Sequence, residues 1–410
     1  MDRVPLSIGR TGEPSSARDS KSLRTAADAA RVAAGARYRG LYIHVPFCAH
    51  KCHYCDFYSF VDTESRAEAY VARLEVEMSA ATEFVRADLE TVFVGGGTPT
   101  LLRAELLQRM LETLRSRLPL RRDAEFTVEA NPETVTEAVA RALVASGVTR
   151  VSLGAQSFEP ALLTTLERRH DPASVARAVG TLQDAGIGSI NLDLIYWIPN
   201  GTLEQWERDL ARTIALNPDH ISAYGLVYEP NTPLTARLRT GKIVRVAEEV
   251  EAAQCTYACQ RLADAGYARY EISNWAKPGQ QCRHNLLYWQ NADWWALGPS
   301  GSAHASGVRW KNVPRLTDWL EAGPFSPVVD VEVLDDDTRA GEAFMLGLRL
   351  VDGLAVAIVE ELIAIGARGE ARRRAISAFE RDGLLIRSNE RLRLSERGLM
   401  IADTVLCELV

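Results

Sequence analysis

The sequence predicts an α/β protein with a parallel sheet, followed by a mostly helical C-terminal domain. Between about residues 41 and 226, short runs of β-forming residues alternate with segments that are long enough for helices. Alternation of this kind is typical of parallel strands joined by right-handed crossovers. Six such units would form an incomplete parallel barrel, and a doubly wound open sheet is the alternative that the pattern leaves open.

The expected strands are short and either apolar or alternating, and they span residues 41–45, 91–94, 125–129, 150–153, 189–195 and 220–226. Between them, Leu, Val and Ala recur at helical spacing. This spacing predicts helices over residues 66–86, 105–117, 137–145 and 172–185. The strand–helix rhythm ends near residue 235, and one amphipathic helix is expected over residues 244–266.

The remainder of the chain divides at a group of prolines, Pro314, Pro324 and Pro327, which indicates a linker. Beyond it we expect helices and a small hairpin, as in a winged-helix-like domain. At the other end, a polar segment rich in Ser, Ala, Gly and Arg contains acidic residues that are rare in transit peptides, which favours a disordered tail. The predicted divisions are a tail at 1–38, a barrel at 39–235, an extension of the barrel at 236–325 and a helical domain at 326–410.

The composition is that of an ordinary soluble protein, with 47% hydrophobic and 25% charged residues. No apolar run approaches the roughly 20 residues of a membrane span. The net charge of −7 argues against nucleic acid as the main substrate, because phosphate binding needs a basic surface. Three of the seven cysteines are clustered, which does not indicate a disulfide framework, and a cytoplasmic, reducing environment is expected. A homodimer is compatible with the sequence.

The most specific feature is a loop with three cysteines, Cys48, Cys52 and Cys55. Iron–sulfur clusters normally take four thiolates. Phe57 stands where a fourth cysteine could lie, so one iron of a cubane cluster would lack a protein ligand. The alternative is a zinc loop completed by His50 or His53. That alternative is disfavoured because structural zinc sites usually contain a second cysteine pair at longer spacing.

The cysteine loop and the preceding Tyr42-Ile43-His44-Val45-Pro46-Phe47 resemble the radical S-adenosylmethionine (SAM) family. The resemblance implies an incomplete (β/α)6 barrel, a 4Fe–4S cluster, and SAM bound to the open iron through its amino and carboxylate groups. Residues at the expected strand ends match SAM-binding positions of the family: Tyr42, Gly96, Gly97, Thr98, Glu129, Gln156, Arg168 and Asp193. In chemical terms, the carboxylates can accept hydrogen bonds from ribose hydroxyls or an ammonium group, and Arg168 can pair with a carboxylate.

Two further features bear on function within the family branch that holds the oxygen-independent coproporphyrinogen dehydrogenases and the haem chaperones. The missing fourth cysteine departs from the dehydrogenases, whereas His284-Asn285-Leu286-Leu287-Tyr288-Trp289 resembles a motif of the chaperones. The resemblance implies haem binding, with His284 as the candidate ligand, and delivery of haem to apo-haemoproteins. Oxidation of coproporphyrinogen III is the alternative function.

Several other residues are candidates for haem binding or for packing. His304 is a weaker candidate for haem, and Cys282 could offer haem a thiolate. Trp197 replaces a glycine of the family and would either narrow the expected cavity or provide a flat surface for a macrocycle. Cys255 and Cys259 lie one helical turn apart without partners nearby in the sequence, so they are expected to be core residues.

Overall fold

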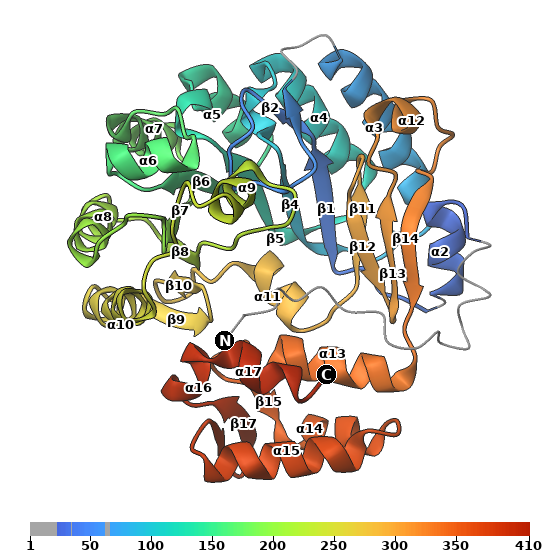
Figure 1. Ribbon diagram of the computed structural model, residues 1–410. Helices are drawn as coiled ribbons and strands as arrows, with labels where there is room; N and C mark the ends of the chain where they lie inside the picture. Colours follow the sequence, from blue (N-terminus) through green and yellow to red (C-terminus); the bar gives the residue numbers. More distant parts are fainter. Residues whose placement is uncertain (1–22, 34, 62–65) are drawn as a thin grey trace.

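The computed structural model describes residues 23–33, 35–61 and 66–410. Within them, one large sheet has the strand order β14-β13-β12-β11-β1-β4-β5-β6-β7-β8-β10-β9 (Figure 1). Its centre is six parallel strands: β1 (Gly40–Val45), β4 (Leu89–Gly96), β5 (Leu120–Ala130), β6 (Arg150–Gln156), β7 (Ser189–Tyr196) and β8 (His220–Gly225). The edge strands β14 and β9 do not pair, so the sheet is an incomplete barrel, as the sequence predicted.

Helices cover the outer face of this curved sheet (Figure 1). They are α3 (Ala67–Ala81), α4 (Ala104–Arg117), α5 (Glu137–Ala145), α6 (Pro160–Leu166), α7 (Pro172–Ala185) and α8 (Leu203–Ala215). The short α9 (Pro233–Arg239) instead contacts the cysteine loop, where the N–H of Leu234 donates to the carbonyl of His53 at 3.0 Å. The side chains of Thr136 and Asp171 cap the first backbone N–H groups of α5 and α7, which therefore begin at the predicted residues.

The two faces of the parallel strands differ in chemistry because side chains alternate along a strand. In β7, Ile190, Leu192 and Leu194 belong to the hydrophobic core. Asn191 and Asp193, between them, line the interior of the barrel. The apolar side chains thus stabilise the sheet against the helices, and the polar side chains are left inside the barrel.

The chain then adds strands to both edges of the parallel sheet. After α10 (Glu248–Asp264), β9 (Ala268–Glu271) and β10 (Asn274–Ala276) pair beside β8. After α11 (Arg283–Trp289), β11 (Trp294–Leu297) pairs with β1, and β12 (Ser302–Ala305), β13 (Val308–Asn312) and β14 (Val328–Val333) follow antiparallel. The short α12 (Leu316–Leu320) lies between β13 and β14. Since β14 belongs to the sheet, the prolines before it do not form a linker, and the sheet passes the boundary expected at 325.

The predicted disordered tail is wrong over part of its length. Its first 22 residues lie outside the described residues, but α2 (Ala26–Val32) is a helix whose N-terminus carries a capping box of Thr25 and Asp28. Its buried alanines join the barrel core, and the N–H of Ala26 donates to the carbonyl of Ser326 at 3.0 Å. A helix with such small side chains folds through long-range packing that composition does not reveal.

The C-terminal region forms a second core beside the base of the barrel (Figure 1). Its helices are α13 (Asp336–Gly347), α14 (Val356–Ala364), α15 (Gly369–Arg381), α16 (Glu396–Met400) and α17 (Ala402–Cys407). A small antiparallel sheet joins β15 (Leu354–Ala355), β17 (Arg391–Leu394) and β16 (Leu385–Arg387), which includes the predicted hairpin. In the described part of the chain, no helix is both long and apolar enough to span a membrane.

Candidate functional site

The three cysteines of the loop lie at the C-terminal end of the barrel. The loop leaves β2 (Phe47–Cys48) and returns at β3 (Phe60–Val61), which pair in parallel. All three thiols are free and half-buried, and they line a cavity of about 400 Å³ over the strand ends. Burial raises the pKa of Cys55 to about 11. The loop therefore holds protons that a bound metal would displace.

The glycine run after β4 positions this loop. The N–H of Gly97 donates to the carbonyl of Val45 at 2.7 Å, and the N–H of Thr98 donates to that of Phe47 at 2.7 Å. A Cβ atom on Gly97 would lie 2.5 Å from the carbonyl oxygen of Phe47, so no other residue allows this approach. Gly96 has φ of +102° and donates its N–H to Glu129 Oε2 at 3.0 Å.

A chain of hydrogen bonds connects the loop to the neighbouring strand ends. Thr98 Oγ1 lies 3.9 Å from Cys48 Sγ and accepts from Asn131 Nδ2 at 3.0 Å. Arg168, which follows α6, donates to Asn131 Oδ1 at 2.8 Å and approaches Cys52 Sγ at 3.7 Å. Its Nε is buried without a partner in the structure, so one donor is free for a ligand. Sequence reasoning missed Asn131, although it stands two residues after Glu129.

Two carboxylates face the same cavity. Asp193 accepts hydrogen bonds from Ser152 Oγ and Asn191 Nδ2, both at 2.8 Å. Burial and the charge of Asp193 raise the pKa of Glu129 to about 7. Among the described residues, neither carboxylate forms an ion pair. The pair therefore fits a ligand with a positive charge and hydroxyl donors, which SAM supplies through its ammonium, sulfonium and ribose groups.

The structure brings most of the predicted SAM residues together with the cysteines. Gly96, Gly97, Thr98, Glu129, Gln156, Arg168 and Asp193 line the cavity of the thiolate loop. Tyr42 lies deeper in the barrel, where its hydroxyl is 3.0 Å from His44 Nδ1. A β-bulge at the end of β6 gives Gln156 a φ of +62°.

The donor set fits a cubane cluster better than zinc. A zinc ion needs its ligands to converge on one point, whereas each thiolate of a cubane binds a different iron. In the part of the chain that the structure describes, no three His, Cys, Asp or Glu side chains converge in that way. His50, one of the two alternatives for a zinc ligand, instead lies 3.7 Å from the carboxylate of Glu167.

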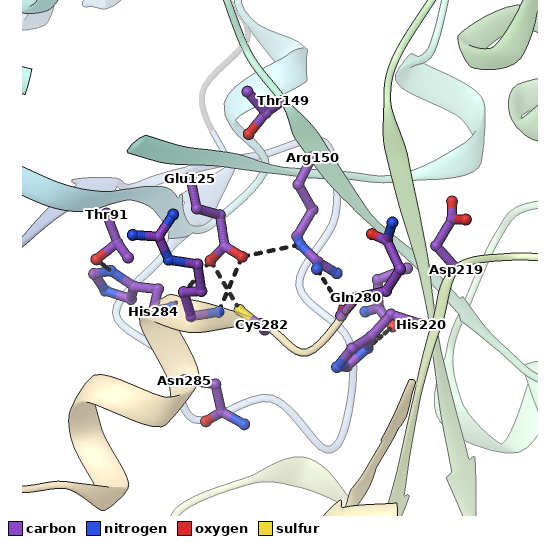
Figure 2. Close-up of polar contacts among 12 residues, drawn as sticks. Thr91, Glu125, Thr149, Arg150, Asp219, His220, Gln280, Cys282, His284 and Asn285 are labelled. Carbon is purple, nitrogen blue, oxygen red and sulfur yellow. Dashed lines mark hydrogen bonds and ion pairs between the residues drawn. The ribbon is translucent and has the colours of Figure 1, made fainter. Parts of the chain in front are cut away.

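The predicted haem residue His284 lies at the opposite, N-terminal end of the strands, on α11 (Figure 2). Its side chain is 1% exposed. Nδ1 is hydrogen-bonded to Thr91 Oγ1 and Nε2 to Tyr288 OH, both at 2.8 Å. Burial lowers the pKa of His284 to about 3, so the imidazole is neutral. In this arrangement both ring nitrogens are occupied.

Glu125 attaches α11 to the base of the barrel (Figure 2). Its carboxylate accepts from the N–H groups of Arg283 and His284, both at 2.9 Å, and thereby caps the first turn of α11. It also accepts from the thiol of Cys282 at 3.4 Å and forms a buried ion pair with Arg150, with Nε at 3.4 Å. This role could not be predicted from the sequence, because Glu125 stands only as the first residue of an expected strand.

The other two candidates, His304 and Trp197, line neither of the two cavities in the barrel. His304 is 3% exposed and hydrogen-bonds the carbonyl of Ala292 at 3.1 Å. Trp197 lines neither cavity of the barrel, because its Nε1 donates to the carbonyl of Glu251 at 3.0 Å and its ring covers Gly225. The replacement of glycine at this position therefore neither narrows the cavity nor offers a surface for a macrocycle.

A second cavity of about 340 Å³ lies between the two ends of the barrel. It is lined by Tyr42, His284 and Tyr288 near the base, and it shares Gly96, Glu129 and Asp193 with the cavity of the thiolate loop. The two cavities thus adjoin each other at these shared residues.

An incomplete barrel with a three-thiolate loop after its first strand defines a radical SAM protein. A family model described as the Radical SAM superfamily matches residues 42–212, and one described as the HemN C-terminal domain matches residues 334–401. Proteins named heme chaperone HemW are similar over most of the chain. The Mycobacterium tuberculosis (strain CDC 1551 / Oshkosh) protein is 38% identical over 89% of this chain and 93% of its own length. The Escherichia coli (strain K12) protein is 33% identical over 89% and 96%.

The chain belongs to the HemW family of radical SAM proteins, and the family implies a 4Fe–4S cluster and SAM at this site. The solved structure of coproporphyrinogen III oxidase (HemN) from Escherichia coli superposes with a TM-score of 0.80 over 94% of both chains. At 20% sequence identity, that similarity shows the fold alone.

The buried Glu125–Arg150 pair yields a prediction about stability. Replacing Glu125 with Ala removes the counter-charge of the buried Arg150 guanidinium, which keeps only the carbonyl of Gln280 at 2.6 Å from Nη2, and leaves two N–H groups of α11 without an acceptor. We expect a loss of about 3–5 kcal/mol in the free energy of unfolding, measured by denaturant titration of tryptophan fluorescence. The half-exposed pair of Arg39 and Glu90 is the control, since Glu90→Ala should cost less than about 1 kcal/mol. Equal losses in the two variants would contradict this role for Glu125.

The raised pKa of Glu129 yields a prediction about SAM affinity. The free protein protonates Glu129 below pH 7, whereas donor groups of SAM favour the carboxylate, so binding at low pH releases a proton. Affinity should therefore rise by up to about tenfold per pH unit towards pH 7 and then level off. Calorimetric titration of the cluster-loaded protein measures this slope. Glu129→Gln should abolish the slope, and Glu137→Gln, at an exposed side chain, should keep it. A slope that persists in Glu129→Gln would exclude Glu129 as its source.

Proposed function

We propose that this protein is a haem chaperone, which binds haem beside a SAM-ligated 4Fe–4S cluster and passes it to apo-haemoproteins. The observation that carries the proposal is the similarity to heme chaperone HemW proteins, 38% identical over 93% of the relative's length. The thiolate loop supports it, because Phe57 stands where a fourth cysteine could lie. The protein works in a reducing compartment, the cytoplasm, because the cluster thiolates must stay reduced.

Haem first contacts an apolar rim around the cavity of the thiolate loop. We define the rim as Phe57, Tyr224 and Val227, which are 65%, 43% and 55% exposed and all line this cavity. Exposed apolar side chains that gather around a cavity are typical of binding sites. A flat macrocycle that binds this rim would transfer its apolar faces from water into contact with the protein. It would lie above the site of the cluster and SAM.

His284 contributes only after a rearrangement. Its two nitrogens are hydrogen-bonded and its side chain is 1% exposed, so ligation of haem iron requires α11 to leave the base of the barrel. The rim is therefore the initial contact, and because His284 lies at the opposite end of the barrel, it ligates the iron only of haem that has moved to the base after α11 is displaced. The net charge of −7 supports a role without nucleic acid.

The proposal predicts separate effects of rim and base variants on haem. Titration of the cluster-loaded protein with haem should give a saturable change in the haem absorption spectrum. Phe57→Ser with Val227→Ser should weaken binding by about tenfold or more, through the loss of apolar area. His284→Ala should keep the initial affinity within about threefold and change only the spectrum of haem that has moved to the base of the barrel. Val244→Ser, at a 70% exposed residue outside the rim, is the control.

Unchanged affinity in the double rim variant would contradict haem binding at the rim. The alternative activity is tested with the same preparation, reduced and supplied with SAM and coproporphyrinogen III. Formation of protoporphyrinogen at enzymatic rates would contradict the chaperone function. Absence of product together with transfer of haem to an apo-haemoprotein supports it.

A further inference from the structure

Two cysteines that the cofactor site does not use lie on one face of α10. Cys255 and Cys259 are four residues apart in this helix, so their side chains are neighbours one turn apart. Their thiols are hydrogen-bonded to each other, and Cys255 is only 7% exposed. We expected both to be core residues because no partner stands near them in the sequence.

The structure supplies a third sulfur from a distant part of the chain. Met400 ends α16 in the C-terminal region, 145 residues after Cys255, and its Sδ lies 3.4 Å from Cys255 Sγ. Met400 is 39% exposed, so the group of sulfurs is approached from solvent on the side of Met400. They lie where the C-terminal region meets the barrel extension.

A fixed positive charge adjoins the sulfurs. Arg269 donates from Nη1 to Cys259 Sγ at 3.5 Å. The guanidinium is held by the carbonyl of Ile272, at 3.1 Å from Nε, and lies 5.1 Å from the ring centroid of Trp275. A guanidinium in this position stabilises a thiolate over a thiol.

We propose that Cys255, Cys259 and Met400 bind a soft monovalent metal ion, Cu(I), between α10 and α16. Thiolate and thioether sulfurs are ligands that Cu(I) prefers. Two thiolates and one Cu(I) carry a net negative charge, which Arg269 balances. The site goes beyond haem binding and does not depend on it.

Two other uses of these cysteines fit the geometry less well. Zinc prefers four ligands from Cys, His, Asp and Glu, and over residues 23–33, 35–61 and 66–410 no three such side chains gather around one point. A disulfide needs Cβ atoms about 3.8 Å apart, whereas neighbours one turn apart on a helix have Cβ atoms about 5–6 Å apart.

The test uses the protein with its cluster loaded, so that Cys48, Cys52 and Cys55 are occupied. Under anaerobic conditions it is titrated with Cu(I) in the presence of a coloured Cu(I) chelator. We expect one equivalent of Cu(I) to leave the chelator for the protein while the cluster absorbance is unchanged. X-ray absorption at the copper edge should then show sulfur ligands only.

Matched variants assign the ligands. Cys255→Ser with Cys259→Ser should abolish the uptake, and Met400→Leu, at a half-exposed position that tolerates leucine, should weaken it by about tenfold or more. Cys407→Ser and Met345→Leu replace sulfurs outside the site and should take up Cu(I) as the wild type does. No uptake by the wild type, equal uptake by the double cysteine variant, or nitrogen and oxygen ligands to copper would overturn the proposal.

Discussion

The close contact between the backbone of Gly97 and the carbonyl groups of Val45 and Phe47 determines where the thiolate loop lies. The N–H groups of Gly97 and Thr98 hold the segment before Cys48, and a side chain at position 97 would collide with it. The same turn gives the N–H of Gly96 to Glu129. One backbone arrangement therefore fixes the distance between the cysteines of the first strand end and the carboxylates of the later ones. The predicted SAM site depends on this contact, since its residues come from five different strand ends.

The barrel has the cysteine cavity at the C-terminal end of its strands and α11 bound at their N-terminal end. Inward-facing residues of the parallel strands are polar, so the interior would be unstable if its base were open and its buried charges unpaired. Glu125 prevents this by capping α11 and pairing with Arg150, which brings His284 over the starts of the strands. In the folded chain, the motif residues His284, Asn285 and Tyr288 are therefore part of the packed base of the barrel. This explains why a histidine that a motif marks as a haem ligand is neutral and buried in the folded chain.

Local patterns in the sequence predicted the fold, and they predicted which strand-end residues lie beside the cysteines. Alternation in β7 and the N-caps at Thr136 and Asp171 are encoded within a few residues, and so is the spacing of the cysteines. The strand-end position of Glu129 and Asp193 follows from the parallel topology, which places successive strand ends side by side. The SAM contacts of these residues stay predictions, as does haem ligation by His284.

The features that could not be predicted depend on partners far along the chain. The alanines of α2 pack against the barrel, and Ala26 bonds to Ser326. Glu125 meets α11 nearly 160 residues later, and Met400 meets Cys255 across 145 residues. A single sequence gives no signal for such pairs, because each residue alone is compatible with an ordinary helix or strand.

The central claim is that three thiolates leave one iron open for SAM at the C-terminal end of the barrel. Electron paramagnetic resonance of the reduced, reconstituted cluster tests it most directly, with and without SAM. SAM should change the spectrum of the wild-type cluster, because it becomes a ligand of the open iron. If saturating SAM leaves the spectrum unchanged, the fourth iron already has a protein ligand or SAM does not reach it, and the cluster has no open iron for SAM.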